Sequence, residues 1–342
     1  MKKLVIAAVV CSALTSMALE SSNLVGYQNL NVQDGNDFVT TTFLKIGTSG
    51  KTLSDYTPVS ARYPTQPYRF SASNFYLTFL DKYGAQRLVK NDEEIIRLHP
   101  AAATDPDLKD RAVVICYLYN RDGDASKTGW FLTADVAAET YKYRLDNYRL
   151  QQGDGFMMYA DSYHNHASDP TKKGVTLTFS GEVDKEDQPF NAFDGNMLTG
   201  NMTPATLTLG SLTPVSARYP TQPYRFSASN FYLTFIDKYG AQRLVKNDPE
   251  IVRLYPAAAT DPDLKDRAVV ICYLYNRDGD MNKTGWFLTA DVAAETFKYK
   301  LDNYEVKAGE GFMMYADSYH NHTTDPTQKG VTITFKSPIP QE

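Results

Sequence analysis

The chain has 342 residues, of which 42% are hydrophobic and 22% are charged, and its formal net charge is −5. This composition excludes an intrinsically disordered chain, and the length suits about two globular domains of ordinary size. The acidic balance argues against nucleic acid or anionic lipid as a partner, because both require clustered lysine and arginine.

The N-terminus has the pattern of a cleaved signal peptide. Lys2 and Lys3 supply positive charge, and the apolar run from Leu4 to Leu14 that follows is too short to cross a bilayer. Ser16 and Ala18 are small residues at the −3 and −1 positions of a cleavage site. We therefore expect an exported protein, located at the cell surface, in the extracellular space or in the periplasm. No later apolar run suggests a membrane span.

The sequence from Thr57 to Ser180 returns without a gap from Thr213 to Lys336. About 106 of the roughly 124 aligned positions are identical, which indicates a duplicated structural unit. We predict a signal peptide at residues 1–18 and two domains, at residues 19–183 and 184–342. These two segments are called the first half and the second half below.

Each half is predicted to consist of short strands separated by glycine-marked turns. The strands expected in the first half are Asn23 to Val32, Asn74 to Asp81, Gln86 to Val89, Ala112 to Tyr119, Trp130 to Leu132, Tyr141 to Asp146, Phe156 to Ala160 and Val175 to Phe179. Asp92 is expected to cap one short helical turn. An all-β sandwich or barrel is expected in each half, and we favour two tandem β-sandwich domains of jelly-roll or Ig-like type.

Cys116 and Cys272 occupy the same position in the two halves, each inside an apolar run. Equivalent buried strands of separate domains rarely bring their Cα atoms within the roughly 7 Å that a disulfide requires. We therefore expect two buried thiols, and the alternative is pairing between molecules.

Five short motifs of the chain are informative when taken together: Ser21 to Tyr27, Leu150 to Phe156, Leu177 to Val183, Gly200 to Pro204 and Leu207 to Gly210. Together they resemble the secreted, often internally repeated β-domain proteins that are common in Verrucomicrobia, Lentisphaerae and related bacteria. That group has no assigned activity, so the resemblance implies exported β-domains and brings no catalytic residue to this chain. The chain departs from the group at Gln152 and Ala308, where such proteins often carry proline.

Four aspartates alternate along two equivalent loops in a pattern typical of calcium loops. They are Asp122 and Asp124 in the first half and Asp278 and Asp280 in the second. The match then fails, because Ala125 stands where the sharp turn requires glycine and Phe131 stands where a bidentate glutamate should be. A hairpin turn is favoured over a calcium site.

Four histidines form a second candidate metal site. They are His164 and His166 in the first half and His320 and His322 in the second. An extended segment would place each pair on one side, as zinc or copper could use. Further ligands are not evident, so a solvated loop is favoured. We predict no cofactor and keep calcium as the alternative.

Aromatic and arginine side chains interleave ahead of a predicted strand in each half. They are Arg62, Tyr63, Tyr68, Arg69 and Tyr76, with the counterparts Arg218, Tyr219, Tyr224, Arg225 and Tyr232. Exposed rings beside hydrogen-bonding side chains can stack on sugars, although many tyrosines must fill the cores. These ten residues are the candidate ligand-binding residues.

No motif of a known catalytic class is present in the sequence. There is no Gly-x-Ser-x-Gly, phosphate loop or His-Glu-x-x-His, and Ser162 beside Asp161 and His164 on one loop is no triad. We predict an exported non-catalytic protein with a structural or adhesive role and a glycan or cell-surface component as its partner. A bivalent carbohydrate-binding protein is the alternative, since two tethered sites favour a repetitive target, and a hydrolase ranks third.

Overall fold

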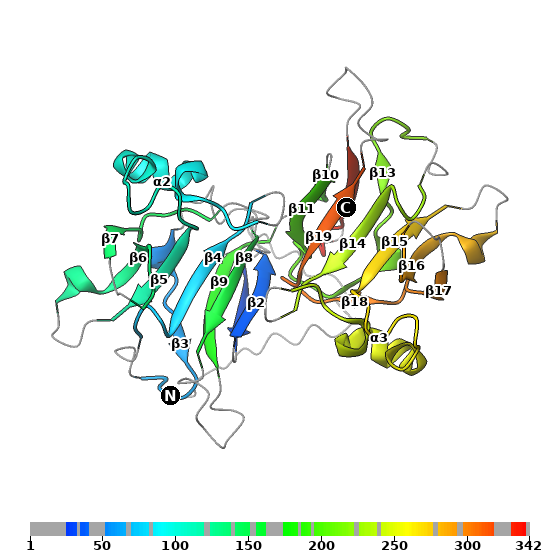
Figure 1. Ribbon diagram of the computed structural model, residues 1–342, viewed down its shortest axis with the longest axis horizontal. Helices are drawn as coiled ribbons and strands as arrows, with labels where there is room; N and C mark the ends of the chain where they lie inside the picture. Colours follow the sequence, from blue (N-terminus) through cyan, green and yellow to red (C-terminus); the bar gives the residue numbers. More distant parts are fainter. Residues whose placement is uncertain are drawn as a thin grey trace, which may run out of the picture.

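The computed structural model of the chain contains two β-rich bodies that lie side by side (Figure 1). It describes residues 25–32, 35–40, 52–65, 70–81, 85–119, 124–137, 141–150, 155–161, 174–183, 186–192, 195–221, 226–237, 241–275, 280–292, 297–317 and 330–339. The predicted all-β class is confirmed. The predicted signal peptide lies outside the described residues.

The first half contains a six-stranded sheet with the order β2-β8-β4-β5-β6-β7 and a three-stranded sheet with the order β1-β9-β3. Neighbouring strands are antiparallel throughout. The strands are β1 Val25–Val32, β2 Gly35–Thr40, β3 Val59–Ser60, β4 Phe75–Phe79, β5 Val114–Leu118, β6 Gly129–Thr133, β7 Tyr141–Arg144, β8 Gly155–Ala160 and β9 Val175–Glu182.

The second half has the same plan, with sheet orders β11-β19-β14-β15-β16-β17 and β10-β20-β13. A further short pair joins β12 to β18. The strands are β10 Gln188–Ala192, β11 Gly195–Gly200, β12 Leu207–Thr208, β13 Val215–Ser216, β14 Phe231–Phe235, β15 Val270–Leu274, β16 Gly285–Thr289, β17 Phe297–Lys300, β18 Glu305–Val306, β19 Gly311–Ala316 and β20 Val331–Phe335.

A hydrophobic core lies between the two sheets of each half. In the first half, Phe156 of β8 and Phe179 of β9 come from different sheets, and their ring centroids lie 6.1 Å apart. Trp130 is buried in the same core, with its ring centroid 6.1 Å from that of Phe75, and it donates a hydrogen bond from Nε1 to the carbonyl oxygen of Tyr56 over 2.9 Å. Trp286 repeats this bond in the second half over 2.8 Å. Buried aromatic side chains from both sheets therefore hold each half together.

One short α-helix follows β4 and one follows β14. They are α2 Glu93–Leu98 and α3 Pro249–Leu254. The predicted cap is confirmed, because the side chain of Asp92 accepts a hydrogen bond from the backbone of Ile95 over 2.9 Å. The stretch from Gln86 to Val89, expected as a strand, makes only isolated bridges. Val89 instead turns inward, is fully buried and begins a 3₁₀ turn.

Cys116 and Cys272 lie on β5 and β15 and are fully buried. Each Sγ lies 3.4 Å from a backbone carbonyl oxygen of the neighbouring strand, that of Phe131 or Phe287. The prediction of two buried thiols is confirmed.

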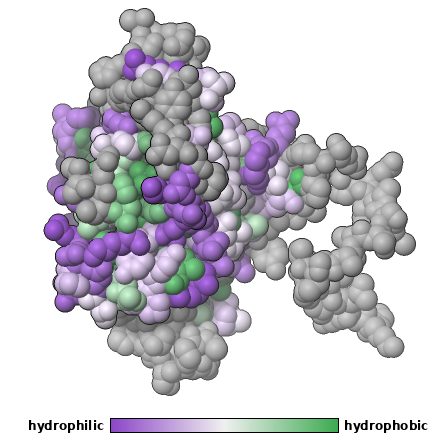
Figure 2. Space-filling view, turned by 90° about the vertical axis from the view of Figure 1, so that its right-hand side faces the viewer, coloured by the Kyte–Doolittle hydropathy of each residue, from purple (hydrophilic) through white to green (hydrophobic). Residues whose placement is uncertain are grey.

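Strands β7 and β17 form the outer edges of the two large sheets, and side chains cover part of each edge. Nε2 of His99 donates to the carbonyl oxygen of Arg144 over 2.8 Å. In the second half the hydroxyl of Tyr255 donates to the carbonyl oxygen of Lys300 over 2.5 Å. Such covering discourages pairing with another chain. The face of the molecule seen in Figure 2, on the side of the second half, mixes hydrophilic residues with a few apolar patches.

Equivalent elements of the two halves contact each other where the halves meet. Strand β2 contacts its counterpart β11. Leu80 and its counterpart Ile236 form one small apolar cluster, against which Met157 and its counterpart Met313 pack. A contact in which the same surface of two units meets itself implies a two-fold relation. Accordingly, α2 lies at the top of the first half in Figure 1, and α3 lies at the bottom of the second.

The described residues include no helix with both the length and the apolar character that a membrane span requires.

Candidate functional site

The loops that bear the candidate residues leave the sheets at one end of each half. In the first half β4 begins at Phe75, opposite Ala160 at the end of β8, and β3 ends at Ser60, opposite Val175 at the start of β9. Strand β5 also ends there, at Leu118, because it runs antiparallel to β4. We call this the loop end, and we call the opposite end, which carries α2 or α3, the helix end. Three sets of candidate residues that are far apart in sequence are thus brought to the loop end. They are Arg62 and Tyr63 after β3, Tyr76 at the start of β4, and Asp124 between β5 and β6.

Arg62 and Tyr63 directly follow β3 at the loop end. The guanidinium carbon of Arg62 lies 5.1 Å from the ring centroid of Tyr63, and both residues are half-buried. The backbone NH of Tyr63 donates to the carbonyl oxygen of Ser60 over 3.1 Å, so the pair is fixed close to the sheet. Arg218 and Tyr219 repeat the contact, again at 5.1 Å. The remaining loop candidates, Tyr68, Arg69, Tyr224 and Arg225, lie outside the described residues.

Tyr76 lies on the outer face of the large sheet, next to Tyr159 of the neighbouring strand β8. The two rings stack with centroids 4.5 Å apart and an interplanar angle of 18°. Partial burial, and secondly the neighbouring Tyr159, raise the pKa of Tyr76 above its ordinary value. Tyr232 and Tyr315 form the same stack at 4.5 Å in the second half. Sequence reasoning selected Tyr76 and missed Tyr159, although the alternation of Phe156 to Ala160 places Tyr159 opposite the core face.

A polar chain of side chains ties the loop before β4 to the end of β8. The hydroxyl of Ser71 donates to Oδ1 of Asn74 over 2.8 Å, and Nδ2 of Asn74 donates to Oδ2 of Asp161 over 2.7 Å. In the second half Asn230 donates to Asp317 over the same distance. Asp161 was noticed in the sequence as a neighbour of the histidines. In the structure it positions the loop end.

Asp124 and Asp280 are the only members of the two predicted metal sites among the described residues. Oδ1 of Asp124 accepts hydrogen bonds from the hydroxyl and the backbone NH of Ser126, over 2.5 and 2.9 Å, and these bonds lower its pKa. Asp280 accepts from the backbone NH of Asn282 over 3.0 Å. Both carboxylates therefore cap a turn. The other candidates, Asp122, Asp278, His164, His166, His320 and His322, lie outside the described residues. Within the described ranges no three His, Cys, Asp or Glu residues are grouped to hold a metal ion.

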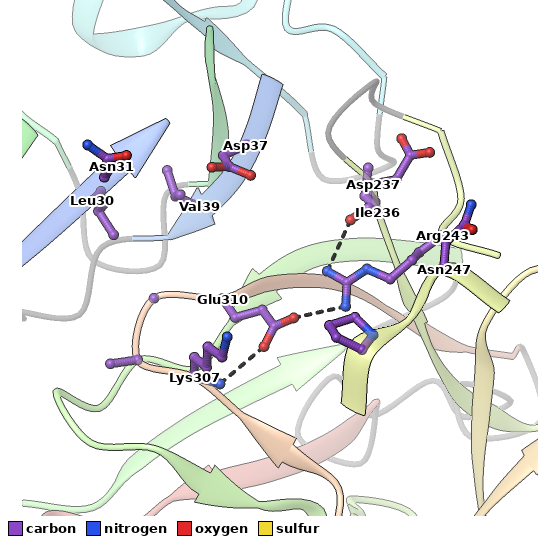
Figure 3. A pocket seen from close by; sticks show the side chains of 13 residues that line it. Leu30, Asn31, Asp37, Val39, Ile236, Asp237, Arg243, Asn247, Lys307 and Glu310 are labelled. Carbon is purple, nitrogen blue, oxygen red and sulfur yellow. Dashed lines mark hydrogen bonds and ion pairs between the residues drawn. The ribbon is translucent and has the colours of Figure 1, made fainter. Parts of the chain in front are cut away.

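A cavity of about 720 Å³ lies between the two halves (Figure 3). Leu30, Asn31, Asp37 and Val39 line it from the first half. The lining residues from the second half are Ile236, Asp237, Arg243, Asn247, Pro249, Lys307, Ala308, Gly309 and Glu310. Sequence reasoning did not find this cavity, because no local pattern shows which surfaces of the two halves meet.

Charged groups line the side of this cavity that belongs to the second half. Nη1 of Arg243 lies 3.0 Å from Oε1 of Glu310 and 3.0 Å from Oδ2 of the buried Asp248. Burial opposes the charged form of Arg243, but Glu310 foremost, with Tyr304 and Asp248, raises its pKa above the ordinary value. This guanidinium is held in place by two carboxylates.

The cavity lining from the second half has diverged from its counterparts more than the rest of the repeat has. Of the nine cavity-lining residues from the second half, five differ from their counterparts. They are Ile236, Pro249, Lys307, Ala308 and Glu310, which stand in place of Leu80, Glu93, Gln151, Gln152 and Asp154. Over the whole repeat only about 18 of the roughly 124 positions differ (124 − 106). By contrast, residues 57–79 at the loop end are identical to residues 213–235.

No family model matches the chain. No curated protein matches it either. Among solved structures, the chain is similar to the one titled "Structure of the Macrobrachium rosenbergii Nodavirus", with 15% sequence identity, a TM-score of 0.12 and coverage of 97% of this chain and 95% of that chain. A TM-score this low carries no argument about fold or function.

Proposed function

We propose that the chain is an exported, non-catalytic protein with a structural or adhesive role, built as two tandem β-sandwich domains that follow a cleaved signal peptide. The observation that carries this proposal is the loop end. Each half carries the same side-chain contacts there, among them the Arg62–Tyr63 pair after β3 and the Tyr76–Tyr159 stack on the outer face of the large sheet. A display surface that occurs twice suits attachment to a repetitive partner.

The polar groups at the loop end support a structural reading. Asp161 accepts from Asn74, and Asp124 accepts from Ser126. In these bonds the carboxylates fix loops to strand ends, which is how a rigid scaffold holds a binding surface in shape.

Binding of carbohydrate is the second candidate function, and the stack of Tyr76 on Tyr159 favours it. Both rings are half-buried on the outer face of the sheet, and the Asn74–Asp161 pair lies at the adjacent strand ends. An aromatic face beside amide and carboxylate groups offers a sugar both an apolar contact and hydrogen bonds. The partner in this case is a glycan of a cell surface or extracellular matrix.

Binding of the full chain to an array of immobilised polysaccharides tests the second candidate. We expect the double variant Tyr76→Ala, Tyr232→Ala to lose binding while it keeps the circular dichroism spectrum of the native protein. The matched control is Lys90→Ala with Lys246→Ala, which changes exposed residues of the helix ends and should bind as the native protein does. Absence of binding by the native chain would contradict carbohydrate binding.

The structural role is tested separately, by fractionating cells that produce the chain. We expect the mature protein in the cell-surface or extracellular fraction and no turnover of polysaccharides or esters. Retention of the protein in the cytoplasm would overturn the proposal of export, and hydrolysis of a polysaccharide or an ester would overturn the non-catalytic role.

A further inference from the structure

The outer faces of the two large sheets meet at the junction between the halves. Met157 and Tyr159 lie two residues apart on β8, so both side chains are on the face opposite the core. Met313 and Tyr315 lie in the same way on β19. Both methionines pack against the one small apolar cluster where the halves meet. The two outer faces are therefore continuous across the junction.

The two-fold relation between the halves keeps both outer faces on one side of the molecule. Figure 1 shows the two large sheets side by side and face-on, with α2 at the top of the first half and α3 at the bottom of the second. Rotation about an axis perpendicular to the sheets produces this reversal and leaves both outer faces turned the same way. The stacks of Tyr76 on Tyr159 and of Tyr232 on Tyr315 thus lie on one broad face.

Methionine side chains occupy this face between the two stacks. Met157 and Met313 are half-buried, and residues 156–160 are identical to residues 312–316. Each half therefore contributes the same apolar groups up to the junction. A thioether side chain is flexible and adapts to the shape of an apolar partner. A sugar chain that leaves one stack can keep apolar contact as it crosses to the other.

Polar contacts between the halves hold the two stacks in this arrangement. Nε2 of Gln28 donates to the carbonyl oxygen of Ala308 over 2.8 Å, and a backbone bridge joins Val39 to Glu310. Sites that are already positioned relative to each other lose less entropy when both bind one ligand.

We propose that both stacks bind one polysaccharide at the same time, and that the polysaccharide crosses the junction over Met157 and Met313. This inference rests on the carbohydrate-binding function proposed above and names its partner as a sugar chain long enough to reach both stacks. Tethered sites strengthen binding to one target only when both sites reach that target together. Two sites on one broad face meet this condition.

Retention on a surface tests whether both stacks act on one target. The probes are the array polysaccharide that gives the strongest signal, immobilised, and its short fragments in solution. We expect the single variants Tyr76→Ala and Tyr232→Ala to bind a short fragment at the remaining site with the affinity of a native site. On the immobilised polysaccharide each should bind about 100-fold more weakly than the native chain, because the second contact is lost.

The outcomes of this comparison separate the inference from the function on which it rests. Equal retention of the native chain and the single variants would overturn simultaneous use of the two stacks, while carbohydrate binding stands. A native chain that binds neither the polysaccharide nor its fragments would overturn carbohydrate binding and this inference together.

Oxidation of methionine by hydrogen peroxide, followed by mass spectrometry, tests the path across the junction. Met157 and Met313 lie half-buried on this path, whereas Met158 and Met314 are fully buried in the cores and serve as internal controls. We expect the polysaccharide to slow the oxidation of Met157 and Met313 to the sulfoxide. Short fragments at the same sugar concentration should leave it unchanged. Unchanged oxidation of both methionines in a chain saturated with polysaccharide would overturn the proposed path.

Discussion

Gln28 of the first half and Gly309 of the second half are in close contact across the junction. Nε2 of Gln28 donates to the carbonyl oxygen of Ala308 over 2.8 Å, and a Cβ added to Gly309 would lie 2.0 Å from that same nitrogen. Gly309 also has a φ of 73°, a conformation that residues with a side chain rarely adopt. Glycine is therefore required at this position for two independent reasons.

We predict that Gly309→Ala loosens the junction. The left-handed conformation costs an alanine about 1–2 kcal/mol, and the new methyl group must also displace the Gln28 side chain. Chemical denaturation should show a lower free energy of unfolding. The distribution of distances between spin labels on cysteines introduced at Ser73 and Ser229 should become broader. The control Gln28→Ala removes the hydrogen bond to Ala308, worth about 0.5–1.5 kcal/mol, and keeps room for Gly309. A Gly309→Ala protein with native stability and a narrow distance distribution would refute the contact.

We predict that Ile236→Asp separates the halves without unfolding them. Ile236 is 8% exposed in the small cluster with Leu80, outside the main core of its own half. Burying a carboxylate in this apolar cluster is costly, and the nearby Arg243, which donates from Nη2 to the carbonyl oxygen of Ile236 over 3.3 Å, is already paired with Asp248 and Glu310. Small-angle scattering should give a larger radius of gyration with an unchanged circular dichroism spectrum. The exchange Leu80→Ile with Ile236→Leu is the matched control and should behave as native. Loss of the native spectrum in Ile236→Asp would show that the residue supports its own half.

We predict that His99→Tyr is nearly neutral and that His99→Ala is destabilising. The second half carries Tyr255 at this position, and its hydroxyl reaches the same carbonyl position of the edge strand. The two rings also pack alike, with centroids 5.0 Å from Tyr143 and 4.9 Å from Tyr299. Removing the hydrogen bond should cost about 0.5–1.5 kcal/mol in urea denaturation. Equal losses in the two variants would mean that the imidazole has a role that the phenol cannot fill.

We predict that the protein loses stability as the pH rises above about 10, where tyrosine ionises in an unfolded chain. Burial raises the folded-state pKa of Tyr76, Tyr232 and, most strongly, Tyr304. A tyrosine whose pKa is higher in the folded than in the unfolded state stabilises the fold fully below the unfolded-state pKa. That stabilisation is lost as the pH rises through the folded-state pKa. The double variant Tyr76→Phe, Tyr232→Phe should weaken this dependence. Titration of tyrosinate absorbance in the native protein checks the raised pKa values. A native chain whose tyrosines all ionise together near the unfolded-state pKa would contradict this prediction.

Local patterns in the sequence predicted the parts of the fold that depend on neighbouring residues. The two-faced apolar run around Cys116 became the central strand β5, and Asp92 caps α2. The segment from Gln86 to Val89 does not form the predicted strand, because Val89 is buried in the core and begins a 3₁₀ turn. Propensity alone did not show that requirement of tertiary packing.

The candidate site was predicted only in part, for a related reason. The sequence identified Arg62, Tyr63 and Tyr76, but the partner of Tyr76 is 83 residues away at Tyr159 and becomes a neighbour only through the register of β4 and β8. The junction was beyond prediction, because near-identical halves carry the same surfaces and the sequence does not show which of them pair. The divergence at Lys307 and Glu310 was visible, but its position in space was not.

The contact of β2 with β11 also has a consequence for the number of repeats. Each of these two strands is an outer strand of its large sheet, and each is covered by its own counterpart. A third copy of the unit would find neither surface available, so the assembly closes at two. Solenoid repeats differ, because they stack head to tail and can grow without limit. Lengthening this protein by further duplication would require a new contact.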